Sequence, residues 1–340
     1  MAVVEREVRA AGVARVVGLL VAVAVLVVVC LVSLAVGARG IPLGTVWDVL
    51  RHDDGSEVAY IVRELRVPRT LVGVLAGAAL GLAGALMQAL TRNPLADPGL
   101  FGVEIGASSA VVVAIAVYDV TTPGDYVWYA LVGAGFTSVL VYVLGSAGRA
   151  ASPERMVLAG AAISAALGAF VAAVLLLDAQ TFDRFRFWAI GSLAGRSMDV
   201  VTEIGPFVLA GCVVALLMGR SLNALALGED TGRALGAHLG RTRVAGALAV
   251  TLLCGAATAA VGPIGFVGLT VPHMARLITG PDNRWVLPYS LVLAPALVVA
   301  ADVVGRVVVA PGELEVGLVL AFVGAPVFIA LCRRRRMAEL

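Results

Sequence analysis

Apolar segments of about 20 residues recur along almost the whole of this 340-residue chain. A helix needs about 20 predominantly apolar residues to cross the roughly 30 Å hydrocarbon layer of a membrane. The chain is 60% hydrophobic and only 14% charged, which is more apolar surface than a water-soluble domain can bury. We therefore predict an all-α membrane protein.

The apolar segments predict about ten transmembrane helices. The first has 23 uncharged residues, too many for the roughly 7–15-residue core of a secretory signal, so we expect it to be retained. The eighth is the shortest and is rich in glycine and proline. The predicted spans are residues 16–38, 69–90, 100–118, 126–147, 157–177, 201–219, 243–261, 263–278, 286–305 and 315–332.

We expect these spans to form a single transmembrane domain over residues 1–340. A charged, loop-like segment interrupts them on each side of the sixth span. The expected parts are the first five spans (16–178), an external segment (179–200), the sixth span (201–218), a cytoplasmic loop (219–243), the last four spans (244–332) and a cytoplasmic tail (333–340).

The distribution of arginine predicts the orientation in the membrane. All 25 basic residues are arginine, and with ten spans and an inside N-terminus 16 face the cytoplasm and nine the outside. Cytoplasmic loops carry the excess of positive charge, and Arg333–Arg336 directly follow the last span, so we predict cytoplasmic N- and C-termini. Arg66 and Arg69 begin one glycine-rich span from outside, and Arg241 and Arg243 begin another from inside, which suggests an inverted repeat.

The absence of lysine excludes one class of function. A P-loop ATP site needs the lysine of its G-x-x-x-x-G-K-[ST] motif, so any ATP hydrolysis must take place in another polypeptide. Few ionisable residues fall inside the predicted spans, which disfavours a carrier driven by protons or sodium. The four cysteines have no C-x-x-C spacing and no basic stripe with interleaved aromatic residues occurs, so neither a metal site nor nucleic-acid binding is indicated.

Residues 66–106 form the most informative motif. Arg66, Pro68 and Arg69 precede an apolar run with four regularly spaced glycines, and the run ends at Gln88 before a tight turn. Small residues on one helix face let neighbouring helices approach closely in a membrane. The motif therefore predicts a closely packed transmembrane helix that is bounded by two structured loops.

The cytoplasmic loop 219–243 is broken by four glycines and carries leucines on both sides of Gly228. Glycine readily adopts conformations that end helices, so we expect two short helices rather than one long one. Their amphipathic pattern fits either a segment that lies on the lipid surface or a knob that docks into a groove of a partner protein.

A second motif, residues 262–284, contains three closely spaced glycines and Pro272. Because proline has no N–H, the carbonyl of Gly268 is left without its helical donor. His273 and Arg276 are three residues apart and share one helix face. No second histidine or carboxylate has the spacing of a metal ligand, so we expect a helix-end cap and an anchor for a cytoplasmic partner.

These motifs resemble those of the FecCD-type family, the permease subunits of ATP-driven type II importers for iron-siderophores, haem and cobalamin. Residues 262–276 are similar to the family element Gly-x-Ile-Gly-Phe-x-Gly-Leu-x-x-Pro-His-x-x-Arg, and the resemblance extends from about residue 40 to 336. Two positions depart from the family pattern. Glu315 stands where a proline is usual, and Ser152–Glu154 stand where small hydroxyl residues are usual.

The resemblance implies a transporter subunit of the bacterial cell membrane rather than an enzyme. Its implied partners are a second permease subunit, identical or homologous, two ATPase subunits and an extracytoplasmic substrate-binding protein. The ATPase subunits would bind ATP and magnesium, and we expect no cofactor in this chain and no nucleic-acid partner. The expected cargo is an iron chelate, a ferric siderophore, with haem or cobalamin as alternatives; an ion-coupled carrier is the alternative from another class.

The resemblance also implies candidate site residues at both ends of the molecule. Arg66, Arg69 and Arg306 are expected to receive glutamates of the binding protein. In the alternative, Arg66 and Arg69 pair with Glu64, and Arg306 pairs with Asp302. The expected ATPase-coupling residues are Leu222, Asn223, Leu227, Gly228, Glu229, Ala234, Leu235, Gly236, His273 and Arg276.

Gly160, Ser164 and Gly168 follow one another at intervals of four on the uncharged fifth span. Small residues at this spacing are typical of close helix packing in lipid. The resemblance implies instead that they line a pathway between two permease subunits. No group of ligands in the sequence could hold bare iron, so we expect the binding protein to supply most of the selectivity.

Overall fold

The computed structural model describes residues 2–37, 39–120, 125–146, 153–228, 231, 234, 238–310 and 312–333. In these ranges the chain is built of helices, which confirms the predicted all-α class. Ten helices overlap the ten predicted segments: α1 (Ala2–Ala35), α4 (Val67–Thr91), α5 (Val103–Tyr118), α6 (Tyr126–Ser146), α7 (Pro153–Leu177), α9 (Met198–Leu217), α12 (Leu239–Val261), α13 (Val267–Thr279), α14 (Asn283–Val308) and α15 (Val316–Arg333). Shorter elements connect them: α2 (Leu43–Arg51), α3 (Glu57–Tyr60), the π-helix η1 (Ile61–Arg66), the 3-10 helix η2 (Pro98–Phe101), α8 (Ala179–Ala189) and α10 (Gly219–Ala226).

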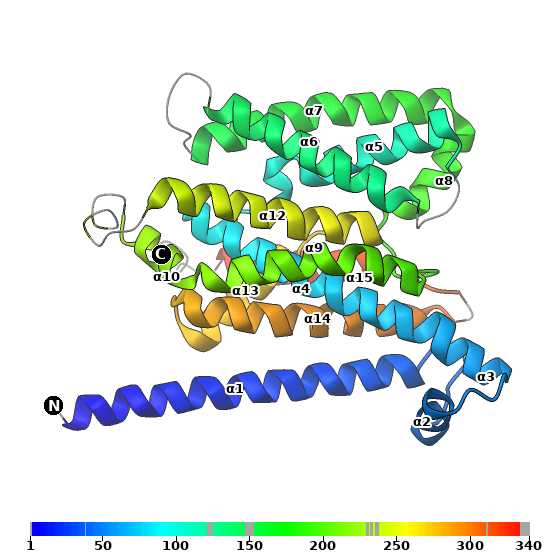
Figure 1. Ribbon diagram of the computed structural model, residues 1–340, viewed down its shortest axis with the longest axis horizontal. Helices are drawn as coiled ribbons and strands as arrows, with labels where there is room; N and C mark the ends of the chain where they lie inside the picture. Colours follow the sequence, from blue (N-terminus) through cyan, green and yellow to red (C-terminus); the bar gives the residue numbers. More distant parts are fainter. Residues whose placement is uncertain are drawn as a thin grey trace.

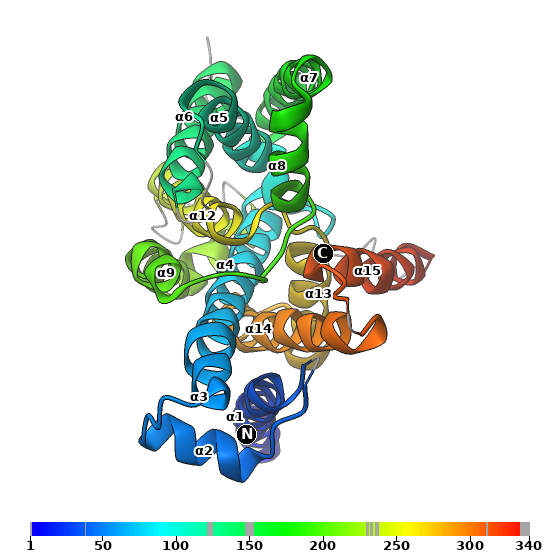
Figure 2. The ribbon, with the colours of Figure 1, turned by 90° about the vertical axis from the view of Figure 1, so that its right-hand side faces the viewer.

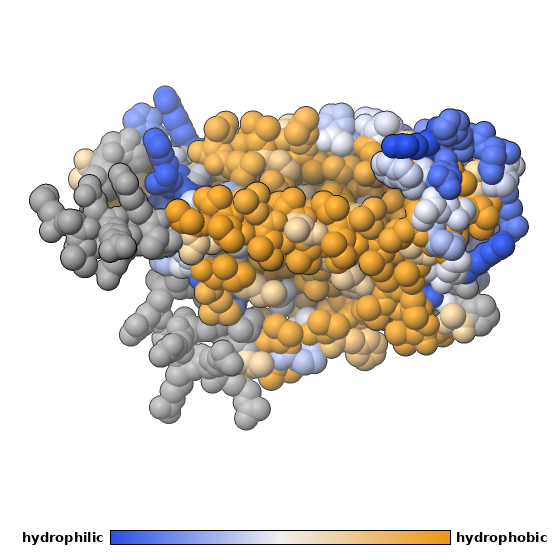
Figure 3. All heavy atoms as spheres, turned by 90° about the horizontal axis from the view of Figure 1, so that it is seen from below, coloured by the Kyte–Doolittle hydropathy of each residue, from blue (hydrophilic) through white to orange (hydrophobic). Residues whose placement is uncertain are grey.

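The long helices run side by side along one axis of the molecule (Figure 1). The start of α1 and α10 lie at one end, and α2, α3 and α8 lie at the other. Hydrophobic side chains cover the surface between the two ends of the molecule. Polar residues gather at the ends themselves (Figure 3). Within the described residues, seven helices are long and apolar enough to cross a membrane. This distribution is that of a protein whose central surface faces lipid.

Helix α4 forms the centre of the bundle, with α9, α12, α13 and α14 packed around it (Figure 2). The most apolar stretch of the helix that contains α4 is 83% buried, whereas that of α7 at the edge is 17% buried. A Cβ atom at Gly77 would overlap the main chain of α14 at Pro295, and one at Gly84 would overlap the main chain of α13 at Gly268. The close packing predicted from the glycine pattern is therefore confirmed.

The segment before α4 is helical, which corrects the predicted start of the second span at residue 69. Residues 57–91 are continuously helical through α3, η1 and α4. Pro68 has no N–H to donate to the carbonyl four residues earlier, and the turn before it widens into a π-helix in which the Val67 N–H bonds to the Val62 carbonyl. Arg66 therefore belongs to a helix and not to a loop.

Helix α13 corrects the predicted eighth span, residues 263–278. Residues 262–266 are not helical, and α13 has only 13 residues, about 20 Å of helix against a hydrocarbon layer of about 30 Å. Its second residue, Gly268, touches Gly84, which lies seven residues before the end of α4. Helix α13 thus begins in the half of the bundle nearer α10 and is too short to cross the layer by itself.

Candidate functional site

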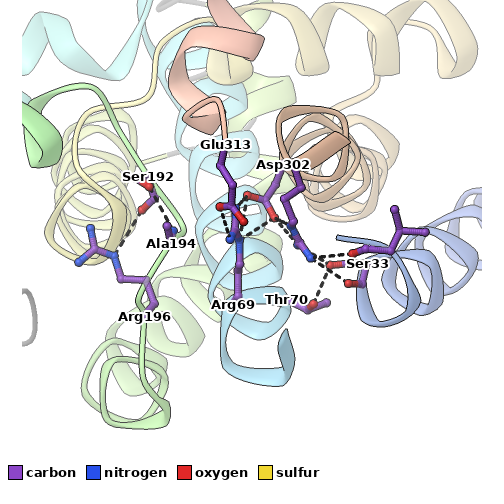
Figure 4. A network of polar contacts seen from close by, with 10 residues as sticks. Ser33, Arg69, Thr70, Ser192, Ala194, Arg196, Asp302 and Glu313 are labelled. Carbon is purple, nitrogen blue, oxygen red and sulfur yellow. Dashed lines mark hydrogen bonds and ion pairs between the residues drawn. The ribbon is translucent and has the colours of Figure 1, made fainter. Parts of the chain in front are cut away.

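The end of α4 that adjoins η1 carries a buried cluster of charges, which we call the outer cluster (Figure 4). Arg69 Nε lies 3.1 Å from both carboxylate oxygens of Asp302, and Arg69 Nη2 lies 2.8 Å from Asp302 Oδ1. Arg69 Nη1 donates to Glu313 Oε2 at 2.8 Å. The Asp302 side chain is 1% exposed and that of Arg69 is 12% exposed, so these ions are held together out of water. Such a pair is stable only because its hydrogen bonds are made.

Arg306 extends this outer cluster to the first helix. Its Nε donates to Asp302 Oδ2 at 2.9 Å, and its Nη2 also contacts this carboxylate. Arg306 Nη1 donates to the main-chain carbonyl of Ser33 at 2.9 Å, and the Ser33 hydroxyl bonds to Thr70 at 2.8 Å. The outer cluster therefore joins α1, α4 and α14 at one point.

The ion pairs predicted as the alternative to docking are confirmed only for Arg306 with Asp302. Arg66 donates instead to the main-chain carbonyls of Leu34, at 2.8 Å, and Arg39, at 2.5 Å. Glu64 is exposed. It stands two residues before Arg66 and five before Arg69, and helix neighbours that share a face are three or four residues apart, so pairing with Glu64 is wrong for both arginines.

The opposite end of α4, near α10, carries a second cluster around Gln88, which we call the inner cluster. Gln88 Nε2 donates to the main-chain carbonyls of Gly268, at 3.1 Å, and Leu269, at 3.3 Å. The Gly268 carbonyl is the one that Pro272 leaves without a helical donor, so a side chain of α4 replaces the missing main-chain N–H of α13. Gln88 Oε1 in turn accepts a hydrogen bond from Arg276 Nη1.

Helix α10 is fixed to the start of α14 beside this inner cluster. Asn223 Nδ2 donates to Asp282 Oδ1 at 2.6 Å, and Asn223 Oδ1 accepts from the main-chain N–H of Asn283 at 2.9 Å. Leu222 and Leu225 are fully buried. Of the predicted coupling residues, Leu222 and Asn223 therefore hold α10 against the membrane helices rather than present a surface.

The other predicted coupling residues that the structure describes are more exposed than Leu222. Leu227 is 61% exposed, Gly228 adopts a left-handed φ of 96°, and Ala234 is exposed. His273 is half-buried on α13. Glu229, Leu235 and Gly236 lie outside the described residues.

The sequence matches the FecCD transport family over residues 25–334. The chain belongs to the FecCD family. FepD of Escherichia coli (strain K12), a ferric enterobactin transport system permease protein, is 47% identical to it over 311 residues, which cover 91% of this chain and 93% of FepD. HmuU of Yersinia pestis, a hemin transport system permease protein, is 35% identical and covers 92% of this chain and 93% of its own length.

A solved structure supports the fold of this chain independently of close sequence similarity. An ABC transporter assigned to the metal-chelate type, in an inward-facing conformation, superposes with a TM-score of 0.82 at 24% identity. The superposition covers 92% of this chain and 98% of that chain. At this identity the likeness establishes the fold alone.

The predicted pathway residues of this FecCD protein lie on α7, at the edge of the bundle. Gly160 is buried, Ser164 and Gly168 are half-buried, and a Cβ atom added at Gly168 would meet nothing within 4 Å. Leu176 and Leu177 of the same helix are each 86% exposed. Much of α7 is therefore open to lipid or to another subunit in this single chain.

Chemistry that depends on a metal has no support within the described part of this FecCD chain. No group of three or more histidine, cysteine, aspartate or glutamate side chains is placed there to hold a metal ion. His273 packs beside Arg276, and a neighbouring positive charge disfavours cation binding. Arg276 contacts Gln88 of this chain, and its role as an anchor for a cytoplasmic partner stays a prediction.

Two buried side chains with polar groups, Trp188 in α8 and Arg196 after it, are not among the site residues predicted from the sequence. They line a cavity of about 250 Å³ together with Glu315. Arg196 Nε donates to the Ser192 carbonyl at 3.3 Å, whereas Arg196 Nη1 and Trp188 Nε1 have no partner among the described residues. Burial lowers the pKa of Arg196 to about 10. The run around Arg196 has no apolar periodicity, so nothing in the sequence marks this arginine as buried.

Proposed function

We propose that this chain is the permease subunit of a binding-protein-dependent ABC importer for a ferric siderophore. The observation that carries the proposal is family membership over nearly the whole chain, with 47% identity to a ferric enterobactin permease. The lysine-free sequence agrees with it, because the motor must then be a separate ATPase subunit. The chain supplies the path and the ATPase supplies the energy.

We propose that the ten main helices are membrane-embedded and that both termini are cytoplasmic. Seven helices are long enough to span, and two shorter apolar ones, residues 103–118 and 316–330, support the count. The start of α1 lies at the same end as α10 (Figure 1), which agrees with an N-terminus on the side of the ATPase. The end with α2, α3 and α8 would then face the binding protein.

In this proposal, two copies or two homologous permeases meet along α7 and enclose the path. The exposed apolar side chains of α7 and the small residues Gly160, Ser164 and Gly168 support this placement, because small residues allow close approach of a partner or a bulky cargo. The exposed Leu227 and the residues after it would contact the ATPase.

Arg66, Arg69 and Arg306 remain our proposed docking residues for the binding protein. Their burial changes how they would act. Arg69, at 12% exposure, is the one that an incoming carboxylate can reach, and it would have to share its donors with Asp302 and Glu313. Arg66 and Arg306 would act mainly by setting the positive potential and shape of the outer face.

The test is reconstitution of the permease with its ATPase and binding protein in nanodiscs. A ferric siderophore on the binding protein is expected to stimulate ATP hydrolysis more than haem or cobalamin does. Stimulation by haem or cobalamin alone would change the cargo and leave the importer class intact. Accumulation of cargo in vesicles that contain the permease alone would contradict the importer proposal.

Haem and cobalamin remain the second candidates because related permeases handle them. HmuU covers 92% of this chain at 35% identity, and the cobalamin import system permease protein BtuC of Halobacterium salinarum covers 82% at 35% identity. Both identities are lower than the 47% shared with FepD. This difference favours the siderophore.

A further inference from the structure

A small pocket with two arginines in its lining lies at the end of the central helix α4 beside α10. The ends of α4, α10 and α13 and the start of α14 enclose it, and its volume is about 260 Å³. Pockets that enclose a whole small-molecule ligand typically measure roughly 300–1,000 Å³. The pocket therefore has the size for one side chain of another protein.

The two charged residues that line the pocket are both arginines. Arg276 donates to the neutral Gln88, Arg92 is exposed, and neither forms an ion pair with a carboxylate of the described residues. Asp282 on the adjoining turn is occupied by Asn223 and by the main-chain N–H of Arg284. Two guanidinium groups without a counter-ion favour a carboxylate, which they can bind through paired hydrogen bonds.

The main chain at Arg92 adds an independent indication. Arg92 ends α4 in the left-handed conformation, with φ 51°, at a position where glycine is favoured. The following turn is fixed, because Asn93 N–H donates to the Gln88 carbonyl at 3.1 Å and Asn93 Oδ1 accepts from Leu95 N–H at 2.9 Å. Residues held in strained conformations cluster at active sites and ligand clamps, so this arginine at the pocket fits a binding role.

The carboxylate or other anion that these arginines favour could come from a protein or from a lipid headgroup. The position of the pocket favours a protein. Helix α4 is surrounded by other helices, so its end lies beneath the middle of the bundle and not at the lipid-facing edge (Figure 2). Ala226, the last residue of α10, lines the same pocket. A protein that contacts the segment after α10 would therefore lie directly over the pocket.

We propose that the pocket receives an acidic side chain of the ATPase subunit, held between Arg92 and Arg276. The inference rests on the proposed function, since it requires an ATPase partner. Arg276 is bonded to Gln88, and Gln88 is bonded to the main chain of α13. A carboxylate bound there is thus connected through two hydrogen bonds to the contact between α4 and α13.

The lysine-free sequence allows a direct test. Arg92→Lys introduces the only lysine of the chain, and a carbodiimide joins a lysine amine to a carboxylate in contact with it as an amide. We expect the Arg92→Lys permease in complex with the ATPase to give a cross-linked product whose peptide masses identify an aspartate or glutamate of the ATPase. The matched control is Arg284→Lys, which is exposed at the same end but does not line the pocket.

The yield from Arg92→Lys should exceed that from Arg284→Lys by about tenfold, because proximity governs the coupling. Arg276→Gln should also lower the affinity of the permease for the ATPase by about tenfold, as expected for loss of a charge-assisted hydrogen bond. Equal yields, or a product within this chain or with a phospholipid, would overturn the inference. Failure of the unaltered permease to bind any ATPase would instead refute the proposed function.

Discussion

The two ends of helix α4 hold arginines in opposite ways. At the outer end, Arg69 and Arg306 share the carboxylate of Asp302 and are closed off from water. At the inner end, about 28 Å away along the helix, Gln88 offers Arg276 only a neutral amide oxygen. One cluster contains its own counter-ion, and the other does not.

This difference separates structural charge from charge that is available to a partner. Removing one member of a buried ion pair leaves a partner unsatisfied and is strongly destabilising, so the outer cluster contributes to the integrity of the fold. A guanidinium that is satisfied only in part can still gain hydrogen bonds from another molecule. The inner cluster is therefore the end of α4 at which a partner gains more by binding.

The largest expected effect is at the outer end. Asp302→Ala leaves Arg69 and Arg306 without their shared carboxylate and should lower the free energy of unfolding by about 3–5 kcal/mol. Unfolding in mixed micelles, followed by tryptophan fluorescence, measures this loss. The control is Glu313→Ala, whose side chain is 35% exposed and whose removal should cost less than about 1 kcal/mol. Equal losses in the two variants would contradict the structural role of the outer cluster.

The junction of α4 with α13 should respond less strongly. Gly84→Ala places a methyl group against the Gly268 carbonyl and should lower the free energy of unfolding by about 1–3 kcal/mol, because the helices must separate. The same micelle titration applies. Gly168→Ala, where the added atom meets nothing within 4 Å, is the control and should be close to neutral. A neutral Gly84→Ala would mean that the inner cluster tolerates separation of the two helices.

Gln88→Glu would make the inner end resemble the outer end. The new carboxylate supplies Arg276 with a counter-ion but loses the donor to Gly268, so the stability should change by less than about 1.5 kcal/mol. The affinity of the permease for the ATPase should fall by about threefold, because Arg276 is already paired with the new carboxylate. Surface plasmon resonance with the permease in nanodiscs measures this affinity. Gln180→Glu on α8 is the control. Unchanged affinity would show that the charge of Arg276 is not what the ATPase binds.

The smallest expected effect concerns docking at the outer face. Arg66→Glu and Arg69→Glu should each weaken binding of the extracytoplasmic protein about threefold at low salt, and less at high salt, because reversed charges repel its glutamates. Arg69→Glu also breaks the buried pair with Asp302, so it should in addition lower the free energy of unfolding about as much as Asp302→Ala does. Binding is compared among variants that elute like the unaltered protein in size exclusion. Arg51→Glu, an exposed change at the same end, is the control. Docking that is unchanged in both variants would remove these arginines from the interface.

The helices could be predicted from the sequence because lipid demands long apolar segments. All ten predicted segments contain a helix, and the glycine pattern around Gly77 and Gly84 correctly predicted close contact. The ends of the helices were less accurate. Neither the π-helix before Pro68 nor the short α13 changes the hydropathy of its segment, so neither alters the pattern on which the prediction depends.

The clusters could be predicted only where their members are close in the sequence. Arg306 and Asp302 are four residues apart on one helix, and their pair was one of the predicted alternatives. Arg69 and Asp302 are separated by 233 residues, and Gln88 and Gly268 by 180. Pro272 did predict that the Gly268 carbonyl would lack a donor. Which side chain would supply it depends on the crossing of α4 and α13, which a single sequence does not contain.

The hydrogen bond from Gln88 to Gly268 has a mechanical consequence. When the main chain of a helix supplies all the hydrogen bonds of its first turn, the helix can slide along a neighbour and keep those bonds. In α13 the donor to the Gly268 carbonyl is Gln88 of α4, so sliding of α13 against α4 would break this bond. A displacement that an ATPase imposes on α13 would break this hydrogen bond unless α4 moves with it. The two helices should therefore move as one lever during transport, and the deformation should fall on the helices of the periphery.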